Sequence, residues 1–168
     1  VPHDTDFILD NRMGDCKDHA TLIDAFYDTV GVESTQALIN SGTSYLLPEI
    51  PMVTSVNHVI NYLPEWDMFV DSTNPSLPFD QLGFSLSDKP VLLVENFKPG
   101  FRTPAMMIGN NSQEIESRMK IQSDGAVAGE IAMKMKGIPA VEVRSSWRHA
   151  TKEQEDQWIE RMFSSNNK

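Results

Sequence analysis

Cys16, His58 and Asp71 are the residues of this 168-residue chain whose chemistry could combine in one reaction. Cys16 is the only cysteine, and the segment Gly14-Asp15-Cys16-Lys17 places it in the first turn of an expected helix. The positive end of a helix dipole stabilises a thiolate, Lys17 adds a positive charge, and backbone N–H groups there can hold an oxyanion. The sequence therefore indicates a nucleophilic thiol, and the alternative is a buried, inert thiol, the commoner state of a free cysteine.

His58 and Asp71 lie on two expected strands joined by Leu63-Pro64-Glu65-Trp66, where proline favours a tight turn. A two-residue turn would place His58 directly opposite Asp71, and a four-residue turn would make them diagonal neighbours on the same face. A three-residue turn would place them on opposite faces. An imidazole held by a carboxylate is the base of a Cys-His-Asp triad. The alternative is a structural hydrogen bond that closes the hairpin.

Asp15, Asp18 and His19 could form a different kind of site. Their spacings of three and four residues place them on one helical face, where they could ligate a divalent metal ion. Carboxylates in a first turn more often cap the helix. A metal-dependent hydrolase therefore stays open as an alternative, while His3 and His149 are expected in loops without convergent partners. The sequence has no phosphate-binding glycine loop, dinucleotide motif or Gly-x-Ser-x-Gly elbow.

The elements expected to position Cys16, His58 and Asp71 lie in the first half of the chain. Apolar residues at helical spacing predict a helix over Asp15–Val30, with Asp15 as its N-cap and Gly31 as its end. Ser34–Asn40 is expected to form a strand, and Val56–Leu63 is expected to pair with Trp66–Thr73.

The second half of the chain has a different sequence pattern, in which short expected strands are separated by turn residues. The expected strands are Val91–Glu95, Glu114–Gln122, Val127–Lys136 and Ala140–Arg144. Asp124-Gly125 predicts a hairpin turn, and Thr151-Lys152-Glu153-Gln154 is a capping box that predicts a final helix containing Trp158. We therefore expect an α+β chain with a core over residues 1–85 and a β-rich module over residues 86–168 that ends in a helix.

Composition excludes several classes of protein. Hydrophobic residues make up 40% of the chain and charged residues 23%, which is typical of a globular protein. With 14 basic and 24 acidic residues the net charge is −10, so nucleic acids and anionic lipid surfaces are poor partners. No apolar run approaches the length of about 18 residues that membrane insertion requires. One cysteine excludes an internal disulfide.

Three segments of the chain resemble the transglutaminase-like superfamily. They are Asn11–Ala20 with the sequence NRMGDCKDHA, Val56–Ile60 with VNHVI, and Phe69–Thr73 with FVDST. The first segment is also similar to bacterial transglutaminase-like proteins that carry an N-terminal domain of unknown function. The resemblance covers about residues 1–80 and implies a papain-like core, in which the cysteine helix packs on an antiparallel sheet. Only 15 residues precede the cysteine, so the resemblance implies a catalytic domain truncated at its N-terminus.

By this resemblance Cys16 is the nucleophile, His58 the general base and acid, and Asp71 the residue that orients His58. The expected activity is acyl transfer on an amide through a thioester, as a peptidase, an amidase or a transglutaminase-like enzyme. The expected substrate is a protein, a peptide or an amide-containing envelope component, and the implied location is exported, in the periplasm or cell envelope. No cofactor is expected, because the calcium ligands of animal transglutaminases have no counterpart here. The alternative is a non-catalytic interaction module of the bacterial envelope.

Overall fold

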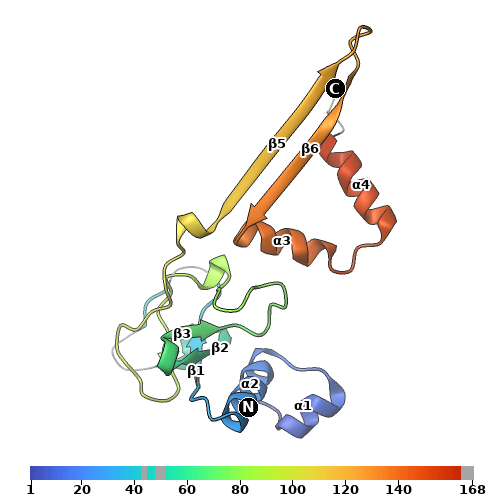
Figure 1. Cartoon of the computed structure of the whole chain (residues 1–168). Coiled ribbons are helices and arrows are strands. Elements are labelled where there is room, and N and C mark those ends of the chain that lie inside the picture. Colours follow the sequence, from blue (N-terminus) through green and yellow to red (C-terminus); the bar gives the residue numbers. More distant parts are fainter. Residues whose placement is uncertain (43–44, 48–51, 164–168) are drawn as a thin grey trace. The chain divides into compact units, whose positions relative to one another are not determined.

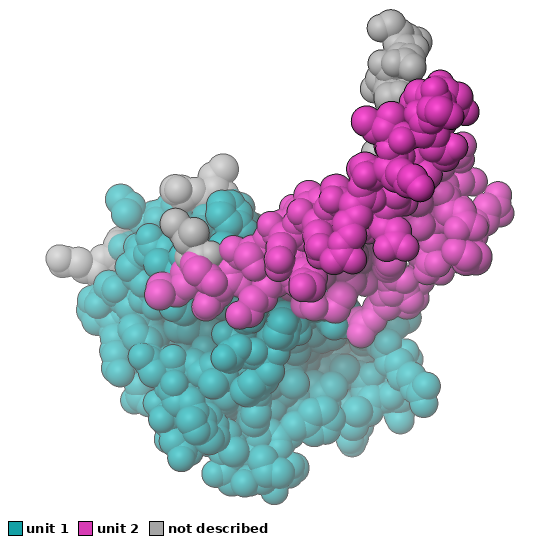
Figure 2. Space-filling model, turned by 45° about the horizontal axis from the view of Figure 1, so that its top comes forward, with its two compact units in different colours: residues 1–106 teal, residues 107–168 magenta. Residues whose placement is uncertain are grey.

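A computed structural model of the chain describes residues 1–42, 45–47 and 52–163. Its α-helices and antiparallel sheets confirm the prediction of an α+β chain (Figure 1). The chain forms two compact units, Val1–Met106 and Met107–Lys168, coloured teal and magenta in Figure 2. The Cys16, His58 and Asp71 side chains all belong to the first unit.

The first unit, unit 1, contains two helices and a four-stranded sheet. The strands follow the order β3-β2-β1-β4, and every neighbouring pair is antiparallel. The bounds of these elements are α1 Thr5–Asn11, α2 Cys16–Thr29, β1 Thr35–Ile39, β2 His58–Leu63, β3 Met68–Val70 and β4 Leu92–Leu93. The predicted helix, the predicted strand after it and the predicted hairpin are therefore confirmed, with shorter strands than expected.

Helix α2 begins at Cys16 because the residue before it is an efficient cap. The Asp15 carboxylate accepts hydrogen bonds from the backbone N–H groups of Lys17 and Asp18, and the Asp18 carboxylate accepts one from the Asp15 N–H. This reciprocal capping box satisfies N–H groups that have no partner inside the helix. At the other end, Gly31 adopts a left-handed φ of 71°, as the predicted end of the helix requires.

Helix α1 has no counterpart in the sequence prediction. Its N-cap is Asp4, whose carboxylate accepts a hydrogen bond from the Phe7 N–H at 2.8 Å. The helix has seven residues, of which Ile8 is buried. Its apolar residues lie side by side in the sequence instead of recurring every three or four positions, so the pattern that identifies an amphipathic helix is missing.

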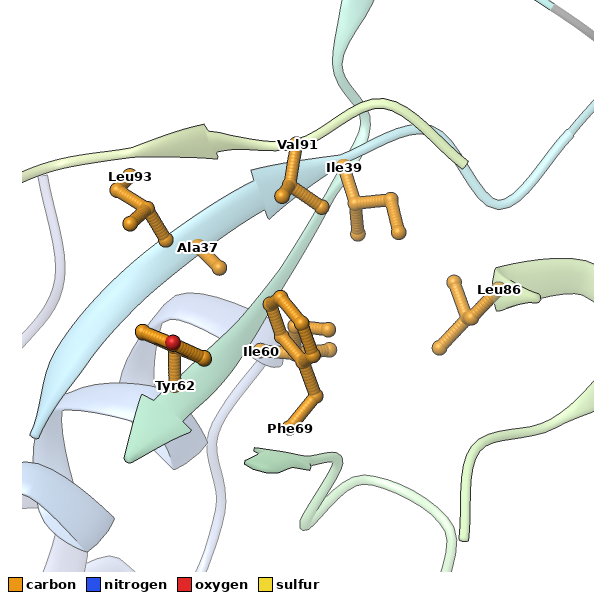
Figure 3. Packing of buried hydrophobic residues seen from close by; sticks show 8 residues of the cluster. All are labelled: Ala37, Ile39, Ile60, Tyr62, Phe69, Leu86, Val91 and Leu93. Atoms are coloured by element: carbon orange, nitrogen blue, oxygen red, sulfur yellow. The ribbon is translucent and has the colours of Figure 1, made fainter. Parts of the chain in front are cut away.

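The sheet of unit 1 is covered on both faces. The face away from α2 forms the main apolar core (Figure 3), whose buried members are Ala37, Ile39, Ile60, Tyr62, Phe69, Leu86, Val91 and Leu93. On the opposite face the fully buried Asn61 donates hydrogen bonds to the Ala20 carbonyl at 3.0 Å and to Asp24 Oδ1 at 2.6 Å, which tie β2 to α2. Alternate residues of β2 therefore point into two different environments.

The two compact units divide after Met106, whereas the expected division was between residues 85 and 86. The segment in between joins unit 1 because β4 pairs with β1 and because Leu86 and Val91 are buried in its core. The strand expected over Val91–Glu95 is correspondingly short, since β4 covers two residues.

The second unit, unit 2, is a long hairpin followed by two helices. Its elements are β5 Ser112–Ile121, β6 Val127–Lys136, α3 Ile138–Trp147 and α4 Lys152–Phe163. The two strands and the turn at Gly125, which has φ of 85°, confirm the predicted hairpin. The capping box is also confirmed, because Gln154 N donates to Thr151 Oγ1 and Thr151 N donates to Gln154 Oε1.

The strand predicted over Ala140–Arg144 is wrong, because this segment lies inside α3. Its alternating apolar and polar residues fit a short strand as well as a helix. The decisive signals lie just ahead of it: Pro139 stands in the first turn, and Gly137 has a left-handed φ of 70° at the N-cap. Proline is well tolerated in a first helical turn and rare within a strand.

Candidate active site

The structure brings His58 and Asp71 together. The turn between β2 and β3 has four residues, since Leu63 pairs with Met68, and the two site residues are therefore diagonal neighbours on one face. His58 Nε2 lies 3.1 Å from Asp71 Oδ2. The His58 side chain is 15% exposed and the Asp71 side chain 6% exposed. The hairpin thus holds an imidazole and a carboxylate in hydrogen-bond contact, mostly shielded from solvent.

Asp71 is held in place by a second set of donors. Both the Thr73 N–H, at 2.9 Å, and the Thr73 hydroxyl, at 2.6 Å, donate to Asp71 Oδ1, which leaves Oδ2 for His58. Burial alone would raise the pKa of Asp71, but the hydrogen bonds from His58 and Thr73 outweigh it and hold this pKa below its ordinary value. The carboxylate is therefore ionised at neutral pH and acts only as an acceptor.

This charge state fixes the roles of the two ring nitrogens of His58. Because ionised Asp71 can only accept, Nε2 must carry the hydrogen of the shared bond. In the neutral ring Nδ1 then has a free lone pair. Nδ1 is therefore the nitrogen that is able to take a proton from a nucleophile.

Cys16 occupies the first position of α2 and is partly exposed. Its neighbour Lys17 forms an ion pair with Asp15, so the positive charge expected to support the thiol is shared with a carboxylate. Within the described residues the thiol makes no hydrogen bond to His58 or Asp71. The structure thus joins two of the three predicted residues by a hydrogen bond and leaves the third without one to either of them.

Contacts between α2 and β1 show which end of the sheet the cysteine approaches. Asp24 accepts a hydrogen bond from Ser34, directly before β1, whereas Thr21 accepts one from Gln36, inside the strand. Helix α2 therefore runs antiparallel to β1. The N-terminal end of α2 points towards the C-terminal end of β1.

That end of β1 is also the end of the sheet where His58 lies. Ile39, the last residue of β1, pairs with His58, the first residue of β2. Cys16 is five residues before Thr21, or roughly 7 Å along the helix axis. The helix start and the imidazole therefore occupy the same end of the sheet.

They approach that end from different faces. His58 shares its face of β2 with the core residues Ile60 and Tyr62, whereas α2 packs on the face that carries Asn61. The thiol could not meet the imidazole across the sheet. A contact between the Cys16 thiol and the His58 imidazole would have to form beyond the end of β2.

Asp15, Asp18 and His19 do not form a metal site. No group of three or more potential ligands in the described parts of the chain is arranged to hold a metal ion. Asp18 is 2% exposed, accepts hydrogen bonds from the N–H groups of His3, at 2.8 Å, and Asp15, at 3.0 Å, and lies 3.1 Å from His3 Nδ1. These contacts, with those from His3 strongest, lower the pKa of Asp18 to about 2. The expectation that His3 lacks a partner is therefore wrong.

The same contacts explain the glycine ahead of the cysteine. A Cβ atom at Gly14 would lie 2.7 Å from the Cβ of Asp18, which is closer than real carbon atoms approach. Gly14 thus lets the chain pass beside the buried carboxylate before α2 begins. Sequence reasoning assigned no role to Gly14 or to His3, since their partner is known only once the chain has folded.

Two cavities involve residues close in sequence to Cys16 or Asp71. One, of about 430 Å³, lies beside Gly14 and is lined mainly by apolar residues of α1 and α2 together with Arg12 and His19. The other, of about 280 Å³, is lined by Asp71 and by residues that follow β3, among them Phe79. Of the three predicted triad residues, Asp71 lines one of these two cavities, and Cys16 and His58 line neither.

Comparison with known proteins finds no matching family model, no matching curated protein and no matching solved structure. The three quoted motifs are therefore the whole basis of the family resemblance. Within the described residues no helix has the length and apolar character needed to cross a membrane.

Proposed function

We propose that this chain is a cysteine-dependent acyl-transfer enzyme that acts on amides. Cys16 is the nucleophile, His58 the general base and acid, and Asp71 the residue that orients His58. The hydrogen bond between His58 and Asp71 carries the proposal. A histidine and a carboxylate are costly to shield from water unless they are paired, and here the pairing also leaves Nδ1 of His58 free to act as a base.

The reaction proceeds through a thioester. His58 Nδ1 takes the proton of the Cys16 thiol, and the thiolate attacks the carbonyl carbon of the amide. His58 then returns the proton to the nitrogen that leaves as an amine, while the acyl group stays on sulfur. Water or a second amine attacks this thioester and restores the thiol. A peptidase or amidase uses water at that step, and a transglutaminase-like enzyme uses an amine.

The position of the cysteine supports the same chemistry. Cys16 stands at the first position of a well-capped helix, where the helix dipole favours a thiolate and backbone N–H groups can stabilise an oxyanion. Its helix begins at the end of the sheet that carries His58. The proposal requires the thiol to meet Nδ1 around the end of β2, in a papain-like arrangement.

An amide-containing protein or peptide of the cell envelope is the proposed substrate, and an exported location belongs to the same proposal.

Alkylation of the thiol tests the proposal without a substrate. Cys16 is the only cysteine, so incorporation of iodoacetamide, followed by mass spectrometry, reports on this residue alone. At mildly acid pH an ordinary thiol, with a pKa of about 8.5, is almost fully protonated and reacts slowly. We expect Cys16 to react at least tenfold faster than a cysteine-containing reference peptide at this pH, and the His58→Ala variant to lose the advantage.

His19→Ala is the matched control, because His19 lies one turn from Cys16 and has no hydrogen bond to Asp71. Its alkylation rate should equal that of the wild type, and a chelator should change neither rate. A wild-type rate equal to that of the reference peptide would contradict the enzyme proposal and favour a non-catalytic interaction module. A rate that falls when a chelator is added would point back to a metal-dependent site.

A further inference from the structure

The β5–β6 hairpin of unit 2 has one charged face and one apolar face. Its register places Ile115 opposite Met133 and Ile121 opposite Val127, so the odd-numbered residues of both strands share the apolar face. The even-numbered residues of β5 form the charged face. Every residue of β5 is exposed, and Ile115 is 57% and Met119 54% exposed. The apolar face of an antiparallel sheet normally packs on a core.

Strand β5 also has a free edge. In the described part of the chain β6 is its one strand neighbour, whereas β6 is followed directly by α3, which packs against it (Figure 1). A two-stranded sheet is marginally stable by itself. An unpaired edge offers a row of backbone donors and acceptors to a further strand. The β5 edge is therefore suited to strand addition.

The order of charges along β5 is complementary to itself. Glu114 and Glu116 precede Ser117, and Arg118 and Lys120 follow it. If two β5 strands pair antiparallel with Ser117 opposite its own copy, Glu114 faces Lys120 and Glu116 faces Arg118 of the other copy. Opposite charges at facing positions stabilise an antiparallel pair.

The apolar face agrees with the same register. Ile115 of one copy then faces Met119 of the other, so like surfaces lie side by side. A shift of two residues would place Glu116 against Glu116 or Arg118 against Arg118. A shift of one residue would set the charged face against the apolar face. Among the neighbouring registers this one alone satisfies both faces.

We propose that unit 2 binds a second copy of this chain by antiparallel pairing of β5 with β5. The product is a four-stranded sheet with the order β6-β5-β5-β6 and a two-fold axis through Ser117. Both copies contribute the same surface, as a two-fold interface requires. Arg118 and Glu116 of one strand, which form an ion pair at 2.7 Å, exchange partners with the same residues of the second strand.

Charge reversal on β5 tests the pairing in the full chain. Glu116→Arg sets arginine against Arg118 of the second copy, and Arg118→Glu sets glutamate against Glu116. The second variant also carries Glu130→Arg, because Glu130 faces position 118 across the hairpin. Mass is measured by analytical ultracentrifugation over a concentration series. The wild type should form dimers, and each variant by itself should associate at least tenfold more weakly.

An equimolar mixture of the two variants decides the matter, because the mixed pair has opposite charges at all four facing positions. The mixture should recover the dimer of the wild type, which two misfolded variants could not do. Glu142→Arg, the same charge change on the exposed side of α3, should leave the dimer unaffected. A wild type that stays monomeric, a dimer that both variants retain, or a mixture that fails to associate would overturn the proposal.

Discussion

The two units of this chain each contain an antiparallel strand pair, but the strands are buried to opposite extents. In unit 1 the alternating residues of β2 are buried on both faces, under α2 and under the main core. In unit 2 the alternating residues of β5 are exposed on both faces. The units also differ in charge: unit 1 carries fifteen acidic and five basic residues, whereas unit 2 carries nine of each. All of the net negative charge belongs to the unit that contains the candidate active site.

The difference follows the strand sequences, since β2 is apolar apart from His58 and Asn61, whereas β5 alternates charged with less polar residues. In unit 1 the cover comes from far along the chain, since Leu86 belongs to the core cluster and the partly buried Leu82 and Phe101 pack against it. In unit 2 the described residues supply no comparable cover for the apolar side of β5. Such a hairpin can still gain a further strand at the free edge of β5, and the order of charges along β5 points to a second copy as the source of that strand.

The largest difference between the units is expected from truncating an isoleucine in each strand. Ile60 is 1% exposed in β2, so Ile60→Ala should lower the free energy of unfolding by about 2–5 kcal/mol through lost burial and a new cavity. Ile115 is 57% exposed in β5, and Ile115→Ala should change it by no more than about 0.5 kcal/mol in dilute solution. Urea denaturation measures both values. Equal losses would show that the apolar side of β5 is buried in solution.

A buried amide should have the next largest effect. Asn61 is fully buried, its NH₂ group donates to Ala20 and Asp24, and its carbonyl oxygen has no partner among the described residues. Asn61→Ala would remove one donor from the Ala20 carbonyl and one from the Asp24 carboxylate, which keeps its hydrogen bond from Ser34, at a cost of about 1–3 kcal/mol. Asn111 of unit 2 also bonds to backbone, donating to the Met107 carbonyl, but it is less buried.

The matched variant Asn111→Ala should therefore cost less than Asn61→Ala when both are measured by urea denaturation. The reverse order would mean that water reaches the α2–β2 interface, and the account of Asn61 as a buried tie between helix and sheet would fail.

Local signals in the sequence were sufficient for the elements that hold the site. Asp15 predicts the start of α2, because a cap acts on residues directly beside it. The parity of the β2–β3 hairpin predicts the contact of His58 with Asp71 for a turn of two or four residues, and the structure has the four-residue form. The hairpin of unit 2 follows from alternation together with Asp124-Gly125.

The features that the sequence did not indicate depend on residues distant in the chain. The face of the sheet on which α2 packs carries Asn61, which bonds to the Ala20 carbonyl forty-one residues away in the chain. The partner of His3 is Asp18, fifteen residues away. The position of Cys16 relative to His58 depends on such long-range contacts. Residue types and spacing alone therefore predicted a triad, whereas the structure has a hydrogen-bonded pair, His58 and Asp71, and a thiol that is not bonded to it.

A pair of glycines should produce a smaller, nearly equal loss in the two units. Gly31 has φ of 71° and Gly125 φ of 85°, and at both positions a Cβ atom would have no neighbour within 4 Å. Gly31→Ala and Gly125→Ala should each cost about 1 kcal/mol, because an L side chain disfavours a left-handed backbone. Differential scanning calorimetry would show whether each variant shifts the same unfolding transition or a separate one for its own unit.

The effect of Asp18→Asn should depend on pH, since asparagine keeps the shape of the side chain and one acceptor oxygen but cannot ionise. The difference from the wild type should be present at neutral pH and should shrink in acid. The pKa of Asp18 is about 2 in the folded chain, and an unfolded aspartate has a pKa of about 3.9. Between these values the unfolded state binds more protons than the folded state, so the wild type loses stability as the pH falls from about 4 to about 2.

Asparagine does not titrate, so the advantage of the wild type over Asp18→Asn should be full above about pH 5 and should disappear towards pH 2. The comparison uses urea denaturation at a series of pH values. Asp10→Asn, which changes an exposed carboxylate of α1, should differ from the wild type by a constant amount over the same range. An advantage that persists at pH 2 would mean that Asp18 acts through its shape alone, and the ionic contact with His3 would then contribute nothing to holding the first residues of the chain against α2.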